Sequence, residues 1–153
     1  MLIRALVESD IDQIVAFTLG DKEYPWSKKE LTDVFQGSVD GTYLIDVGVD
    51  ENTGRVTAYA VASYVFDQAD VQNIVVDQSF RGLGLGRQIL QSITKELASR
   101  GVTGVFLEVR PSNQTAVNLY QSMGFERIQK RRDYYPGVDG MREDAWVFSL
   151  MYL

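Results

Sequence analysis

The sequence predicts an α/β (α+β) fold in which about four helices flank a mixed central sheet of about seven strands. Short apolar stretches with alternating side chains recur along the chain, and stretches with a helical period lie between them. Their order is β-α-α-β-β-β-α-β-α-β-β. The chain has 153 residues, of which 45% are hydrophobic, so we expect one domain over residues 1–153 with a substantial core.

Capping patterns mark the first two helices. Ser9 and Asp12 stand three residues apart, which is the spacing of a helix start. Ser27 and Glu30 form a complete capping box for a helix over residues 28–35. The residues that flank this box, Trp26 and Leu31, are placed to form a hydrophobic staple.

Glycine and asparagine delimit the later elements. Gly86 stands near the start of a long helix, and Gly101 and Gly124 are expected to end two helices at positions that favour glycine. Asn113 is expected to cap the helix that Gly124 ends. The expected strands cover residues 1–5, 43–49, 55–66, 70–76, 105–109, 126–134 and 144–150.

Composition excludes several kinds of active site. The chain contains neither Cys nor His, so Ser-His-Asp and Cys-His nucleophile systems and zinc sites built on these residues are excluded, and no metal is expected. Acid-base chemistry must come from Asp, Glu, Tyr, Lys, a chain terminus or water. The absence of a signal-peptide pattern, a long apolar run and cysteine makes the cytoplasm the expected location.

The formal net charge of −6 argues against direct nucleic-acid binding, which needs a basic surface. An acidic surface attracts basic peptides and amines, although many proteins are acidic simply for solubility. We therefore expect no nucleic-acid or membrane partner, and a monomer or weak dimer.

A glycine-rich loop stands between an expected strand and the long helix. Its pattern is R-x-x-G-x-G from Arg81 to Gly86. A helix N-terminus exposes unpaired N–H groups, and glycines allow a ligand to approach the backbone, so the loop suits a diphosphate. The spacing is not G-x-G-x-x-G, and Gly86-Arg87-Gln88 does not match G-K-[S/T]. Taken alone, the loop could also be a turn that only packs a helix on a sheet.

This segment resembles the acetyl-CoA-binding motif of the GNAT superfamily, [Q/R]-x-x-G-x-[G/A]. The resemblance implies acetyl-CoA as the acetyl donor, with its pyrophosphate on the loop and its pantetheine arm along the preceding strand. Leu83 departs from the family pattern, in which a polar or basic residue is common. The implied cofactor-binding residues are Ile74, Val75, Val76, Arg81, Gly82, Leu83, Gly84, Leu85, Gly86, Arg87 and Asn113.

The segment 106–126 is similar to the family's E-V-R-x-S-N-x-x-A-x-x-L-Y-x-x-x-G-F pattern. It is closest to the RimI-like branch, the ribosomal-protein alanine N-acetyltransferases. Segments 24–27, 131–136 and 142–145 resemble that branch as well, so the likeness spans the chain. It implies transfer of acetyl to the N-terminal alanine of a small-subunit ribosomal protein, S18, with a basic N-terminal segment.

The chemistry needs a group that accepts a proton from the amine and one that protonates the thiolate. An α-amino group has a pKa of about 7.7–8.0, so a sizeable minority is already neutral at pH 7. Residue chemistry leaves Glu108 open as a base or as an ion-pair partner of Arg110. By the same reasoning, Tyr120 is either a general acid or an ordinary core residue, and Asn113 is the N-cap of a helix. The resemblance implies that Glu108 is the base, that Tyr120 is the acid and that Asn113 contacts CoA.

Pro25, Trp26 and Tyr134 are candidates for the acceptor pocket, although Trp26 and Tyr134 also suit ordinary packing. Other acceptors remain open: a different protein N-terminus, a lysine or a small-molecule amine. A different class of function, a CoA-binding module without turnover, is disfavoured because both Glu108 and Tyr120 are present.

Overall fold

The computed structural model describes residues 1–18, 26–39, 41–136 and 140–152. These residues form one seven-stranded sheet and four α-helices, which confirms the predicted fold class and element order. Among them, no helix combines the length and apolarity needed to cross a bilayer. The elements are β1 (Leu2–Ala5), η1 (Glu8–Asp10), α1 (Ile11–Thr18), α2 (Lys28–Val39), β2 (Tyr43–Val49), β3 (Val56–Val65), β4 (Gln68–Val76), η2 (Gln78–Phe80), α3 (Leu85–Ser99), β5 (Gly104–Val109), α4 (Gln114–Ser122), β6 (Glu126–Pro136) and β7 (Arg142–Met151).

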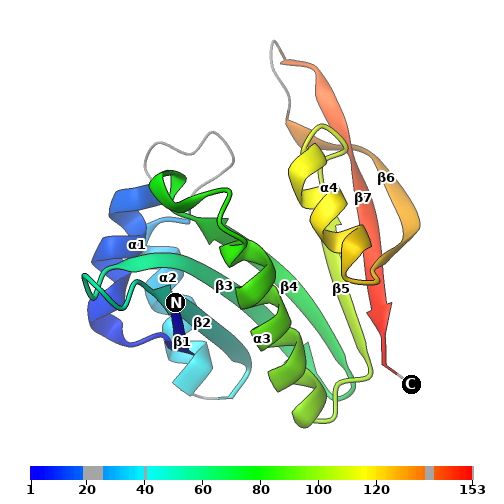
Figure 1. Ribbon diagram of the computed structural model, residues 1–153. Coiled ribbons are helices and arrows are strands. Elements are labelled where there is room, and N and C mark those ends of the chain that lie inside the picture. The colour runs from blue at the N-terminus through cyan, green and yellow to red at the C-terminus, as the bar shows by residue number, and fades with distance from the viewer. Residues whose placement is uncertain (19–25, 40, 137–139, 153) are drawn as a thin grey trace.

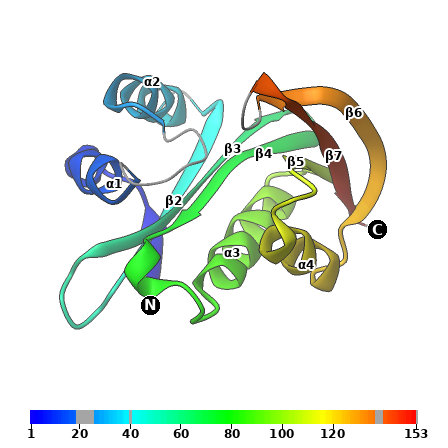
Figure 2. The ribbon, with the colours of Figure 1, turned by 90° about the horizontal axis from the view of Figure 1, so that it is seen from above.

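The strands follow the order β1-β2-β3-β4-β5-β7-β6 (Figure 1). Only the β4–β5 pair is parallel among these neighbours, and α3 makes the crossover between them. Helices α1 and α2 cover one face of the sheet, and α3 and α4 lie on the other (Figure 2). The strand-to-helix turn after β4 therefore starts α3 beyond the part of β4 that pairs with β5, Gln68–Val71.

Strand β3 lies between two hydrophobic cores and is buried on both faces. Ala58, Ala60 and Ala62 belong to the core beneath α3, whereas Tyr59 and Val61 belong to the core beneath α1 and α2. This division follows from the two-residue period of a strand. The small alanine side chains leave room for the apolar stripe of α3 above the sheet.

Helix α2 confirms its predicted start and extends beyond its predicted end. Ser27 Oγ accepts from the backbone N–H of Glu30 at 3.1 Å, and Glu30 accepts from that of Ser27 at 3.2 Å. The helix ends at Val39, not near residue 35. Gly37 is kept inside it because a Cβ there would lie 2.5 Å from the Tyr43 ring.

Helix α1 begins differently from the sequence prediction. The η1 turn precedes it, Val7 is the N-cap position in place of Ser9, and Asp10 is the capping acid in place of Asp12. The buried Asp10 carboxylate accepts from the N–H of Val7 at 2.9 Å and from Arg4 at 2.7 and 3.0 Å. Arg4 lies on β1, so this contact ties the helix start to the sheet.

Candidate active site

Strands β4 and β5 separate in the middle of the sheet. Their pairing covers Gln68–Val71 and Gly104–Leu107, yet the strands run on to Val76 and Val109. A cavity of about 210 Å³ lies where they part. Five predicted site residues, which are distant in sequence, are among its lining residues: Trp26, Ile74, Glu108, Asn113 and Tyr120.

Glu108 lies on the predicted face of β5. Phe106 and Glu108 are half-buried, whereas Val105, Leu107 and Val109 are buried in the core beneath α3 and α4. The alternative prediction of an ion pair with Arg110 is wrong. The partner of Glu108 is Arg131, whose guanidinium lies 3.3 Å from Oε1.

Arg110 has other contacts. Its guanidinium lies 3.7 Å from the Glu143 carboxylate and 4.5 Å from the centre of the Tyr135 ring. Glu143 also accepts from the N–H and Oγ of Ser112, both at 2.9 Å. These Ser112 hydrogen bonds, helped by Arg110, lower the pKa of Glu143. Glu143, at the start of β7, thereby fixes the turn between β5 and α4. The sequence gives no local signal for this contact, because Ser112 and Glu143 are 31 residues apart.

Tyr120 and Asn113 each serve the local structure and face the cavity. The Tyr120 ring lies 5.9 Å from that of Phe125 and 6.3 Å from that of Phe148, so its ring is partly core. Asn113 caps α4 as predicted, with its side chain accepting from the N–H of Ala116 at 3.2 Å. Both residues also line the cavity, so packing and a role in the site are compatible.

The glycine loop has the conformation that its sequence requires. Gly82 and Gly84 have φ values of 81° and 79°, a region that favours glycine, and Gly84 is the N-cap of α3. The first α3 hydrogen bond runs from Gln88 to the carbonyl of Gly84. The N–H groups of Leu85, Gly86 and Arg87 precede it and are available for an anion. These donors and the absent Cβ atoms fit a diphosphate.

The side chains around this loop pack on neighbouring elements. Arg81 Nε donates to the carbonyl of Val76 at 3.1 Å, and Arg87 donates to Ser122 Oγ on α4. Leu83, which departs from the family pattern, is 64% exposed. Val75 packs toward α1 and α2, and Val76 packs toward α3.

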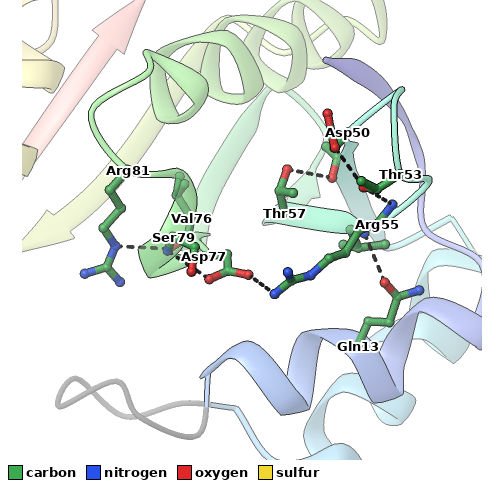
Figure 3. A network of polar contacts seen from close by, with 11 residues as sticks. Gln13, Asp50, Thr53, Arg55, Thr57, Val76, Asp77, Ser79 and Arg81 are labelled. Atoms are coloured by element: carbon green, nitrogen blue, oxygen red, sulfur yellow. Dashed lines mark hydrogen bonds and ion pairs between the residues drawn. The ribbon is translucent and has the colours of Figure 1, made fainter.

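A buried acid fixes the end of β4. The side chain of Asp77 accepts from the N–H of Ser79 at 3.1 Å and pairs with Arg55 at 2.8 Å (Figure 3). Arg55 also stacks over Phe80, 5.7 Å from its ring centre. Arg55, from the β2–β3 hairpin, thus contacts both ends of η2 and stabilises the segment that leads into the glycine loop.

A second cavity of about 760 Å³ lies beside the first and shares Glu108 and Trp26 with it. Trp26 packs against the core beneath α1 and α2, to which Leu31 belongs, and it also lines the cavity. Tyr134 also lines this cavity, and the neighbouring Glu108 carboxylate raises the pKa of the Tyr134 phenol. Pro25, the third predicted acceptor residue, lies outside the described residues.

A bulge in β6 presents Arg131 and Tyr134 to this cavity. The pairing with β7 shifts between Arg131 and Tyr135, and Asp133 has a φ of 52°. Asp144 accepts from the N–H of Asp133 at 3.0 Å, and Arg142 donates to the carbonyls of Asp133 and Tyr134. Sequence analysis noted this segment but assigned Arg131 no role.

The glycine loop, the parted strands and the Glu108–Tyr120 cavity can be compared with known proteins. The model of the acetyltransferase (GNAT) family matches residues 11–125. The chain belongs to the GNAT family. As a GNAT enzyme, it is an N-acetyltransferase that depends on acetyl-CoA.

Relatives of this GNAT chain include the ribosomal protein bS18-alanine N-acetyltransferase of Escherichia coli strain K12. The two are 40% identical over 127 residues, which cover 83% of this chain and 81% of that one. The crystal structure of the ribosomal-protein-S18-alanine N-acetyltransferase from Escherichia coli matches with a TM-score of 0.88 and 36% identity, covering 99% and 94% of the two chains. A phosphinothricin acetyltransferase from Sinorhizobium meliloti, in complex with AcCoA, shares the fold at 19% identity and a TM-score of 0.84, covering 99% and 88%.

Proposed function

We propose that this GNAT enzyme transfers acetyl from acetyl-CoA directly to the α-amino group of an N-terminal alanine on ribosomal protein S18. The observation that carries the proposal is the meeting of Glu108 and Tyr120 at one cavity where β4 and β5 part. The choice of acceptor is supported by the Escherichia coli relatives, which are 36–40% identical and are S18-alanine N-acetyltransferases.

Acetyl-CoA supplies the acetyl group as a thioester. The N–H groups at the start of α3 bind its diphosphate, and the edge of β4 that β5 leaves unpaired aligns the pantetheine arm beside Ile74. Asn113, at the start of α4, lines the same cavity. This arrangement aims the thioester at the space between Glu108 and Tyr120.

Glu108 and Tyr120 divide the proton transfers between them. Glu108 accepts the proton that the amine loses as its nitrogen forms the new C–N bond, directly or through a water molecule. Tyr120 gives its proton to the sulfur as the C–S bond breaks. No Cys or His is needed, and no acetyl group is carried on the enzyme.

Mass spectrometry of a peptide panel tests this function. Each peptide is incubated with the enzyme and acetyl-CoA, and fragment ions locate any acetyl group. We expect acetylation at the α-amine of peptides that begin with alanine. The matched control is the same peptide with a blocked α-amine and an internal lysine, which should remain unmodified. Acetylation of that lysine, or of small amines alone, would contradict the proposed acceptor.

Direct transfer has a separate test. The enzyme is mixed with acetyl-CoA alone, denatured quickly and weighed by mass spectrometry. We expect the mass of the unmodified chain. An acetylated chain that passes its acetyl group to an added peptide would contradict the direct mechanism.

A further inference from the structure

Asp70 is a second carboxylate on the face of the sheet that carries Glu108. In the parallel pairing, Asp70 lies opposite Phe106, and Glu108 is two residues further along β5. Side chains two residues apart on a strand share a face. Both carboxylates line the larger cavity, which Tyr134 and Trp26 also line. Asp70 therefore faces the space that is proposed to hold the acceptor.

The charges around this cavity do not balance. Among the described residues, its charged lining consists of Asp70, Glu108 and Arg131, which leaves one negative charge in excess. Arg131 lies within ion-pair distance of Glu108, at 3.3 Å. Within the described ranges, no cation lies within 4.0 Å of the Asp70 carboxylate, and Arg131 acts on it only from further away. The excess charge therefore lies at Asp70.

The surroundings of Asp70 favour a cationic partner. The Asp70 side chain remains exposed, and its partial burial raises the pKa of its carboxyl; the nearby charge of Glu108 raises it further, and Arg131 opposes both. A carboxylate in such a place is stabilised by an added positive charge. The reacting amine cannot supply that charge during the reaction, because it must be neutral to attack. A guanidinium or ammonium on a neighbouring side chain of the acceptor can supply it.

We infer that Asp70 selects acceptors that carry a cationic side chain within a few residues of the reacting amine. This inference rests on the proposed function and makes Asp70 a residue that determines specificity for the acceptor's sequence. The cavity has room for more than the first residue, since its volume of about 760 Å³ is that of a site for a sizeable ligand. Gln68, Gln72 and Gln129 add amide groups to its walls.

The test compares peptides that differ only in one charge. A neutral peptide that begins with alanine is the parent, and single arginines replace glutamine at its second, third or fourth position. For the wild-type enzyme we expect kcat/KM to be about tenfold higher for the best arginine peptide than for the parent, with most of the difference in KM. Asp70→Asn should reduce this preference to about twofold or less. Asp70→Lys should reverse it in favour of a glutamate peptide.

Glu126→Gln is the matched control, because it removes one exposed carboxylate from β6 that does not line the cavity. It should keep the wild-type preference. A preference that survives Asp70→Asn, or that falls equally in Glu126→Gln, overturns the inference. Wild-type acetylation of all peptides at similar rates overturns the role of Asp70 alone, whereas failure to acetylate any peptide overturns the proposed function with it.

Discussion

Arg131 reaches from β6 to within 3.3 Å of the Glu108 carboxylate on β5, although β7 lies between the two strands. The same carboxylate raises the pKa of Tyr134, three residues further along β6. The Arg131 guanidinium lies 5.5 Å from the Tyr134 ring centre, so the three side chains form one cluster. The proposed base is thus held by the closing hairpin, not by its own strand.

Replacing Arg131 should weaken catalysis modestly. Arg131→Gln removes the ion pair, and both partners are partly exposed, at 47% and 28% of their side chains. Such pairs contribute up to about 1 kcal/mol, so we expect kcat to fall about two- to fivefold, with partial recovery in Arg131→Lys. Arg132→Gln removes the same charge from the neighbouring residue, which lines neither cavity. Steady-state kinetics measure kcat for each variant. If kcat falls as much in Arg132→Gln as in Arg131→Gln, the loss comes from the change in net charge and the role of the Arg131–Glu108 ion pair is contradicted.

Gly84→Ala should affect both stability and cofactor binding. The φ of 79° strains any residue with a Cβ by about 1–2 kcal/mol. Relief of that strain would shift the N–H groups that open α3, and we expect the Kd of acetyl-CoA to rise roughly tenfold. Gly54→Ala, at a φ of 73° in the β2–β3 hairpin, is the control. Scanning calorimetry should find similar losses of stability in both variants. Titration calorimetry should find weaker acetyl-CoA binding only in Gly84→Ala. Equal acetyl-CoA affinities of the two variants would contradict the role of the loop.

Asp46 should make stability fall as pH rises. Burial of Asp46, on the sheet face beneath α3, raises its pKa to about 6, with Glu96 adding to the shift and Arg100 opposing it. The folded state therefore holds this proton more tightly than the unfolded chain does. Stability from this residue is complete below about pH 4 and is lost as pH rises through about 6.

Asp46→Asn should remove that loss, because asparagine stays neutral. We expect the free energy of unfolding of Asp46→Asn minus that of the wild type to increase by about 2–3 kcal/mol between pH 4 and pH 7. Urea unfolding of both proteins at several pH values measures this difference, in which the contributions of other carboxylates cancel. A difference that does not change with pH would contradict the assignment to Asp46.

The elements of the fold were predictable because their signals are local. The Ser27–Glu30 capping box, the Asn113 cap and the left-handed Gly101 and Gly124 are all found where the sequence places them. Errors arose where tertiary contacts decided the outcome. The contact with Arg4 holds Asp10 where it accepts from the N–H of Val7, so the first helical turn begins before Ser9, and the Tyr43 ring accounts for the glycine inside α2.

The proposed site was predictable only in part, for the same reason. Strand alternation gave the face of Glu108, and the glycine pattern gave the loop that opens α3. The nearby Arg110 was considered as an ion-pair partner of Glu108 and Arg131 was not, because nothing local indicates that a bulge at Asp133 carries Arg131 across β7. Asp70 and Glu143 were missed because their neighbours are distant in sequence: Glu108 lies beside Asp70 across the β4–β5 pairing, and Ser112 is 31 residues from Glu143.

The central claim is that Glu108 and Tyr120 carry the proton transfers of an acetyl transfer at the parting of β4 and β5. Single-turnover kinetics with an alanine peptide, for the wild type, Glu108→Gln and Tyr120→Phe, test it most directly. The account predicts that each substitution slows the chemical step by roughly 10²–10⁴-fold while acetyl-CoA still binds at the α3 loop. Near wild-type rates in both variants would contradict it.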